Sequence, residues 1–262
     1  MSFFDGFRFR RVSSPIHELD PRVKFLYVCV VFVIAVLFNQ LLPLLFLFFM
    51  QIPFVVVARV QREWIRSMKG SAMFAMLIFV TNWLSLYFYG SYESFAWLLE
   101  RSLAMTLRFI ILIESFSIFF LTTSPDLLGL ALEQSGIPYE FCFAFTTAIR
   151  FVPVLAEEAQ TIMDAQKSRG LELEKGSFLK RIKNYIPILI PLIVSAIRRS
   201  LELAEAMESR AWGAIKKRTN LYVLKMGPND YYLAVISIVM LILAVYIWLY
   251  IPIPSLMQLV LP

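Results

Sequence analysis

Histidine and cysteine are scarce in this chain of 262 residues, which contains one histidine and two cysteines. A single histidine excludes a histidine-rich metal site and disfavours Ser-His nucleophilic catalysis. We interpret His17, in "SSPIHELDPR", as a residue at the start of a helix rather than as a ligand. Cys29 and Cys142 lie far apart in apolar segments, which is more typical of buried free thiols than of a disulfide.

Motifs for nucleotide and zinc chemistry are missing as well. The chain has neither a G-x-x-x-x-G-K-[ST] phosphate loop nor H-E-x-x-H. We therefore predict that it is not an enzyme and that it binds no cofactor or metal itself. The net charge of +6 does not indicate nucleic acid, because the basic residues are grouped between apolar runs, as topology signals are. No small-residue cleavage site follows the first apolar run, so no removable signal peptide is expected.

Apolar residues, by contrast, make up 59% of the chain, with 24 phenylalanines. A soluble domain has roughly 45–50%, so lipid is the expected solvent for part of this chain. A spanning helix needs about 20 mostly apolar residues. Five segments qualify as candidates, and the first two are joined only by Asn39-Gln40: 23–38, 41–58, 71–90, 102–121 and 231–254.

The basic residues predict how these spans are oriented. All but Arg101 and Arg108, 23 of the 25, fall in the N-terminal segment, the 59–69 loop or the 122–229 segment. These three segments lie on one side of the membrane if five spans alternate. Because Lys and Arg accumulate on the cytoplasmic side, we expect a multi-pass protein of the cell membrane with its N-terminus in the cytoplasm.

The segment 122–229 is too polar to span and too apolar for a free loop. Ser124 is a predicted N-cap before Pro125, and Gly136 is a predicted helix stop. Two long helices follow, the first of which we expect to bend at Pro153. The apolar middle of the second, "YIPILIPLIVSAI", would extend about 20 Å as a helix, short of the ~30 Å hydrocarbon core. We expect both helices at the membrane surface or packed together, with a membrane hairpin as the alternative.

The two long helices end in similar sequences, "DAQKSRGLEL" and "EAMESRAWGA", in which Arg169 and Arg210 are 41 positions apart. Each arginine suits the helix dipole, and Gly170 suits a C-cap, so each ending could be a stop signal alone. Two similar endings also suit two docking sites on a pseudo-symmetric partner, where each guanidinium offers a planar fork for carboxylates or carbonyls. Such a pair fits coupling to a paired ATPase.

Two charged residues, Arg108 and Glu114, lie within the fourth candidate span. Charges at such positions are often functional. We consider them a possible intramembrane polar pair. The alternatives are an interhelical pair, a contact with a partner subunit, or a proton or ion relay.

The chain resembles the transmembrane T component of energy-coupling factor (ECF) transporters, a branch of ABC importers for vitamins and metal ions. The resemblance covers nearly the whole chain and includes "LDPRVKFL" at 19–26, "LTTSPDLLGLALEQSGIPYEF", "AIRFVPVLAEEAQTIMDAQKSRG" and "AMESRAWG". It implies that the tips of two coupling helices dock on two ATPase subunits, which would bind ATP and Mg. The docking residues it implies are Ser168, Arg169, Gly170, Ser209, Arg210 and Ala211.

Serine replaces the family's alanine in both motifs, and Ala211 replaces the second glycine. Because alanine adopts positive φ less readily than glycine, we expect the second helix to end differently from the first, at Gly213. The resemblance also implies a membrane-embedded, substrate-binding S component. Apolar residues of the coupling helices are candidates for contact with it, or for packing within this chain: Phe141, Phe143, Phe145, Ile188 and Leu192.

We therefore predict an all-α membrane protein with about five spanning helices and a cytoplasmic coupling domain of long amphipathic helices. The predicted domains are a membrane domain at 1–121, the coupling domain at 122–229 and a last span at 230–262. The predicted function is transmission of ATP-driven motion to the S component. The alternatives are a secondary transporter that uses Glu114 and Arg108, a membrane scaffold and, last, an intramembrane enzyme.

Overall fold

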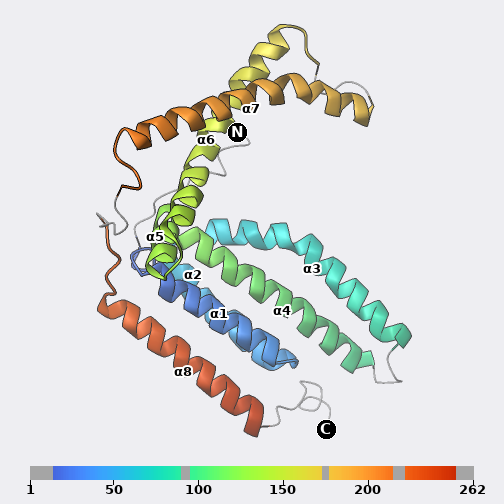
Figure 1. The fold of residues 1–262 in the computed structure, drawn as a ribbon. Coiled ribbons are helices and arrows are strands. Elements are labelled where there is room, and N and C mark those ends of the chain that lie inside the picture. The colour runs from blue at the N-terminus through green and yellow to red at the C-terminus, as the bar shows by residue number, and fades with distance from the viewer. Residues whose placement is uncertain (1–13, 90–94, 173–176, 215–221, 252–262) are drawn as a thin grey trace. The chain divides into compact units, whose positions relative to one another are not determined.

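The computed structural model describes residues 14–89, 95–172, 177–214 and 222–251. Within these ranges the chain forms helices and no strand, so the predicted all-α class is confirmed. The helices shown in Figure 1 are α1 (Pro21–Leu37), α2 (Leu41–Ala58), α3 (Gln61–Tyr89), α4 (Phe95–Thr122), α5 (Pro125–Gln134), α6 (Tyr139–Ser168), α7 (Phe178–Glu208) and α8 (Pro228–Tyr250).

The described residues form two compact units. We call 14–131 with 224–251 the core unit, and 132–223 the arm unit. The predicted domain limits at 121/122 and 229/230 remain predictions. Both chain connections between the units follow from this division: α5 leads out of the core unit, and the chain returns just before α8.

Five of the described helices are long and apolar enough to cross a membrane: α2, α3, α4, α6 and α8. Four of them coincide with predicted spans. Two helices differ from the prediction. The 17 residues of α1 extend only about 26 Å as a helix, so α1 is not among the five. The apolar first half of α6 places that helix among them. The sequence predicts the reverse, a spanning α1 and a non-spanning α6.

Helices α3 and α4 are longer than their apolar segments predict. The predicted 59–69 loop is a short break at Arg59, which has a left-handed φ of 57°, followed by the first turns of α3. Likewise α4 begins at Phe95, ahead of the predicted 102. Hydropathy marks the stretch that suits lipid, whereas backbone hydrogen bonding continues through charged turns whose side chains reach outward.

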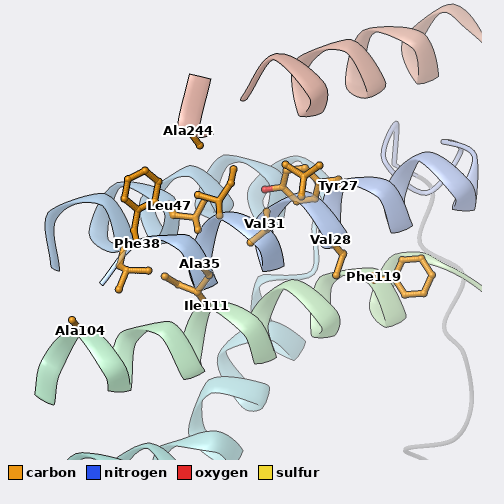
Figure 2. Close-up of a cluster of buried hydrophobic side chains, with 13 residues drawn as sticks. Tyr27, Val28, Val31, Ala35, Phe38, Leu47, Ala104, Ile111, Phe119 and Ala244 are labelled. Atoms are coloured by element: carbon orange, nitrogen blue, oxygen red, sulfur yellow. The ribbon is translucent and has the colours of Figure 1, made fainter. Parts of the chain in front are cut away.

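The core unit is held together where α1 packs against α4 and α8, and α4 against α2 and α3. Alanines lie at several of these contacts: Ala35 is fully buried, and Ala104 and Ala244 are 2% and 8% exposed. Small residues let helices approach closely, which is the main route to dispersion contacts where lipid removes the hydrophobic driving force. Figure 2 shows this cluster around Val31, Leu47 and Ile111, which come from α1, α2 and α4.

A second buried cluster lies where α2 ends and α3 begins. Val55 and Ala58 of α2 pack with Trp64 of α3 and Ile118 of α4. Beside these contacts, the fully buried Gln51 donates through Nε2 to the Ser115 hydroxyl, at 2.8 Å. Polar contacts of this kind join helices in an apolar medium, where an unpaired donor is costly.

The arm unit contains α6 and α7, which cross each other in Figure 1. Pro153 lies inside α6, and Pro187 and Pro191 lie inside α7. The turn before α6 follows the expected pattern: the Ser124 hydroxyl accepts the Leu127 N–H at 3.4 Å at the start of α5, and the chain turns with a φ of +99° at Gly136.

Candidate functional site at the ends of α6 and α7

Helix α6 ends in a Schellman motif built on Gly170. The Gly170 N–H donates to the Lys167 carbonyl at 2.9 Å, and the Leu171 N–H donates to the Gln166 carbonyl at 3.0 Å. Gly170 has a φ of +87°, the left-handed conformation that this motif requires. Arg169 is the C-cap residue immediately before it. This ending therefore places an arginine at the point where the helix stops and the chain reverses.

Helix α7 ends in the same motif, built on an alanine. The Ala211 N–H donates to the Glu208 carbonyl at 2.9 Å, and the Trp212 N–H donates to the Met207 carbonyl at 3.0 Å. Ala211 has a φ of +56°. Our expectation that this helix ends differently, at Gly213, is wrong. The two carbonyl bonds of the motif outweigh the cost of about 1–2 kcal/mol for a left-handed alanine.

Arg169 and Arg210 consequently occupy equivalent positions, one residue before the left-handed residue of each motif. Both arginines are exposed. Among the residues that the structure describes, neither guanidinium has a hydrogen-bond or ion-pair partner. Each guanidinium therefore leaves its five N–H donors unengaged, at the negative end of a helix dipole. The hydroxyls of Ser168 and Ser209 turn back to their own helices, on the carbonyls of Asp164 and Ala206.

An aromatic cluster anchors the end of α7. The Trp212 ring lies 4.4 Å from that of Phe143 and 5.3 Å from that of Tyr139, measured between centroids, so the end of α7 packs on the start of α6. These rings contribute roughly 0.5–1.5 kcal/mol per pair beyond area burial. The arginine at the end of α7 is thus carried on a helix end that is fixed within the arm unit.

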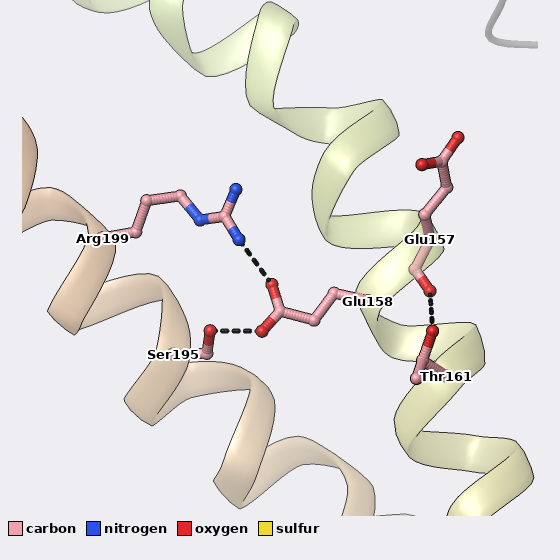
Figure 3. A network of polar contacts seen from close by, with 5 residues as sticks. All are labelled: Glu157, Glu158, Thr161, Ser195 and Arg199. Carbon is pink, nitrogen blue, oxygen red and sulfur yellow. Dashed lines mark hydrogen bonds and ion pairs between the residues drawn. The ribbon is translucent and has the colours of Figure 1, made fainter.

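A polar network joins the middles of the two long helices (Figure 3). Glu158 of α6 accepts from Arg199 of α7, with 3.1 Å between Oε2 and Nη2, and its other oxygen accepts from the Ser195 hydroxyl. The three side chains are partly buried. Because each carboxylate oxygen accepts a hydrogen bond from α7, the two bonds together restrict the angle at which the helices cross. Sequence reasoning missed this network, because only the crossing brings Glu158 opposite α7.

A second contact between the helices compensates for a proline. Pro191 has no N–H, so the Pro187 carbonyl lacks its donor inside α7. The side chain of Gln166 in α6 donates to that carbonyl instead, at 3.4 Å. The proline spacing was a signal for a free carbonyl at 187, although it did not identify the donor.

The five apolar residues expected at the S-component contact fall into different environments. Phe141 is 59% exposed, whereas Phe145 and Leu192 are half-buried. Phe143 packs on Trp212. Ile188 is only 4% exposed, which agrees with the alternative that it packs within this chain. The exposed apolar side chains of α7 that do form a free surface are Ile182, Ile186, Leu189, Ile190, Ile193, Val194, Ile197 and Leu201.

Arg108 and Glu114 do not form the polar pair considered above. Arg108 donates through Nη2 to the Phe38 carbonyl at 2.6 Å and to Asn39 Oδ1 at 2.8 Å, which fixes the turn between α1 and α2. Glu114 is fully buried, and neither carboxyl oxygen makes a well-formed hydrogen bond among the described residues, with the Trp64 side chain as its one polar neighbour there. Six positions apart on one helix, the two side chains point to different sides, since only residues three and four apart face each other.

The remaining sequence candidates are structural. His17 accepts or donates at Nδ1 with the Ser14 hydroxyl, at 2.7 Å, in the turn before α1, as expected of a residue at the start of a helix. Burial and the neighbouring charge of Lys24 lower the pKa of His17. Cys29 and Cys142 are free thiols. A search of the described ranges reveals no group of three metal-ligating side chains.

Comparison with known proteins gives a consistent result. Residues 12–221 match the family CbiQ, described as "Cobalt transport protein". A protein of Clostridium kluyveri named "Energy-coupling factor transporter transmembrane protein EcfT" is 32% identical over 251 residues, which cover 89% of this chain and 92% of the relative. Proteins of the same name from Lactococcus lactis subsp. cremoris and Acidaminococcus fermentans are 32% and 34% identical, over 90% and 89% of this chain and 94% and 91% of the relatives.

Proposed function

The chain belongs to the CbiQ family and is a transmembrane component of an energy-coupling factor transporter, and from this premise we propose that it couples ATPase motion to substrate uptake. In this proposal two ABC ATPase subunits dock in the cytoplasm on the ends of α6 and α7. A membrane-embedded S component binds the substrate, a vitamin or metal ion, and packs against the exposed apolar residues of the arm unit. ATP and Mg are bound by the partner ATPases.

The observation that carries this proposal is the equivalence of the two helix ends. Arg169 and Arg210 precede left-handed residues in two Schellman motifs with the same hydrogen bonds, and both guanidinium groups are exposed without partners among the described residues. Two matching projections suit two matching sites on an ATPase pair. Ser168 and Ser209, with Gly170 and Ala211, set the backbone of each projection, and the arginines supply the charged donors.

The apolar surface of α7 supports the second partner. Ile190, Ile193 and Ile197 are 55–57% exposed on a helix of the arm unit. A contiguous exposed apolar surface marks a contact with protein or lipid. The proposal assigns this surface to the S component and the surrounding bilayer, with the N-terminus of the chain in the cytoplasm.

The test is co-purification of the ATPases with the tagged chain from its native membrane in mild detergent. We expect the double variant Arg169→Glu with Arg210→Glu to insert normally and to lose the ATPases by at least roughly tenfold, since buried charged anchors at interfaces contribute 2 kcal/mol or more. Either single variant should lose less, because two linked contacts share the binding.

The matched control is Lys183→Glu with Arg198→Glu, which makes the same change of charge at exposed positions in the body of α7. It should retain the ATPases. Normal ATPase binding by the Arg169 and Arg210 double variant, at normal expression, would contradict the docking assignment. Solute movement down an ion gradient by the chain alone would instead favour the secondary transporter.

A further inference from the structure

Three charged side chains are buried at places where helices of the core unit begin or end. Lys24 is 2% exposed, Asp20 4% and Asp230 5%. We call these three residues the terminus cluster. Because a buried charge is tolerated only when it is paired or hydrogen-bonded, the partners of each side chain show what the cluster holds together.

The two carboxylates lie at the beginnings of two helices. Asp20 is the N-cap of α1, and its Oδ1 accepts the Arg22 N–H at 2.9 Å. Asp230 lies in the first turn of α8, and its Oδ2 accepts the Gly227 N–H at 2.7 Å. The other oxygen of Asp230 accepts the backbone N–H of Asp20 at 2.8 Å. Asp230 therefore ties the start of α8 to the start of α1.

The ammonium group lies at the end of a third helix. Lys24 Nζ donates to the carbonyl of Thr122, the last residue of α4, at 2.9 Å, and to the carbonyl of His17 at 3.2 Å. Its charge is also attracted by Asp230 and Asp20. Carboxylates favour helix N-termini and cations favour C-termini. Each of the three helix ends thus has a buried charge of the complementary sign.

The same helix ends are where the chain leaves and re-enters the core unit. After Thr122 the chain continues through α5 into the arm unit. It returns to the core unit at Leu224 and begins α8 at Pro228. The residues held by the terminus cluster therefore lie next to both covalent connections, although nearly a hundred residues separate the two connections in sequence.

We propose that Lys24, Asp20 and Asp230 are positioning residues for transport. They fix the two connections to α1, so that movement of the arm unit is passed to the membrane helices instead of being absorbed by bending of the connections. Rigid-body and shear movements need such fixed points, because a loose connection decouples the parts that it joins. The inference rests on the proposed function, in which the arm unit moves with the ATPases.

The test uses the full complex with its ATPases and S component, reconstituted in lipid vesicles. Spin labels at the exposed positions Leu103 of α4 and Leu249 of α8 report the distance between these core helices, with both native cysteines replaced by serine. The distance distribution is recorded without nucleotide and with ATP and vanadate, and ATP hydrolysis is measured on the same samples. The variants are Lys24→Met and Asp230→Asn.

We expect the wild-type complex to change this distance with ATP. In both variants ATP hydrolysis should persist, while the fraction of complexes that respond should fall on the order of tenfold, within the usual range of coupling energies. Lys225→Met is the matched control, since Lys225 is an exposed lysine on the returning connection, and it should respond like the wild type. If the cluster had a structural role alone, assembly and ATP hydrolysis would fall together. The fraction of responding complexes would then fall only in proportion to them.

The proposal is overturned if the assembled variants respond like the Lys225→Met complex, or if the wild-type distance does not change with ATP. Failure of both variants to assemble would also count against it, because the cluster would then serve folding alone. Failure of the proposed function appears elsewhere: the wild-type chain would neither retain the ATPases nor support ATP hydrolysis.

Discussion

The core unit and the arm unit differ in how they place charged residues at the ends of their helices. In the core unit Lys24 and Asp230 are buried and hydrogen-bonded at helix ends. In the arm unit Arg169 and Arg210 stand exposed at helix ends, and α7 exposes a row of isoleucines. The core unit thus engages the charges at these helix ends internally, whereas the arm unit leaves the donors of its two terminal arginines for other molecules. The difference indicates which unit is built to receive partners.

The largest expected effect comes from removing the buried ammonium group of the core unit. Lys24→Met leaves the carbonyls of Thr122 and His17 without the donor that they accept from, and a buried acceptor left unpaired lowers the free energy of unfolding by about 1–3 kcal/mol. Thermal unfolding of the chain in detergent measures the loss. Lys225→Met, at an exposed position, should change the free energy of unfolding by less than about 0.5 kcal/mol. Equal effects of the two variants would contradict the contrast between buried and exposed charges.

Within the arm unit, the left-handed residues of the two helix ends can be exchanged. Gly170→Ala should destabilise the end of α6 by about 1 kcal/mol, and Ala211→Gly should stabilise the end of α7 by a similar amount. A Cβ on Gly170 would have no atom within 4 Å, so the expected penalty comes from the backbone alone.

Hydrogen exchange of the Leu171 and Trp212 amides, the donors that close the two motifs, measures both effects. Protection should fall roughly fivefold at Leu171 and rise roughly fivefold at Trp212, the factors that correspond to about 1 kcal/mol. Changes of the same sign at both amides would show that the two helix ends do not share one backbone geometry.

A smaller effect is expected from the network between α6 and α7. Glu158→Gln removes the charge that Arg199 contacts, but both side chains are partly exposed, at 24% and 37%, so the loss should be at most about 1 kcal/mol. Glu202→Gln, which makes the same change of charge at an exposed position of α7, is the control. The angle between α6 and α7, followed by spin labels on each helix, should broaden in the Glu158 variant only. An unchanged distribution would mean that the aromatic contacts of Trp212 set the crossing.

The smallest effect concerns pH and belongs to the core unit. The pKa of His17 is lowered from 6.5 by burial and by Lys24, so the unfolded chain binds a proton more readily than the folded chain does. Its contribution to stability is therefore fully present above about pH 6.5 and declines as the pH falls below this value. His17→Gln should flatten this part of the curve of unfolding temperature against pH. A curve with the same slope would assign the pH dependence to other groups.

Much of the fold could be predicted because its signals are local. The apolar runs predicted α2 to the residue and α8 to within four residues at each end, and Ser124 and Gly136 predicted where α5 begins and where its turn ends. Helix starts at Gln61 and Phe95 were missed, since charged turns extend a helix without adding hydropathy. The position of the two arginines was predicted as well, because they are part of repeated helix endings.

The prediction for Ala211 failed for a physical reason. Intrinsic preference disfavours positive φ in alanine, yet the closing hydrogen bonds from Ala211 and Trp212, and the packing of Trp212 on Phe143, all favour the reversed turn. The last of these contacts joins residues that are far apart in sequence, so no local pattern contains it. For the same reason the sequence left open whether Ile188 is exposed or packs within the chain, and burial at 4% exposure favours packing.

Hydropathy, charge placement and capping act over a few turns of chain, so the helical class, the membrane setting and the two arginine-bearing helix ends could be read from local sequence. Three contacts follow instead from the tertiary structure: Glu158 with Arg199, Arg108 with the α1–α2 turn instead of Glu114, and Asp230 with the backbone N–H of Asp20. These contacts depend on which helix faces lie together. Packing of the whole chain determines which helix faces meet. A polar group that becomes buried between them then needs a hydrogen-bond partner.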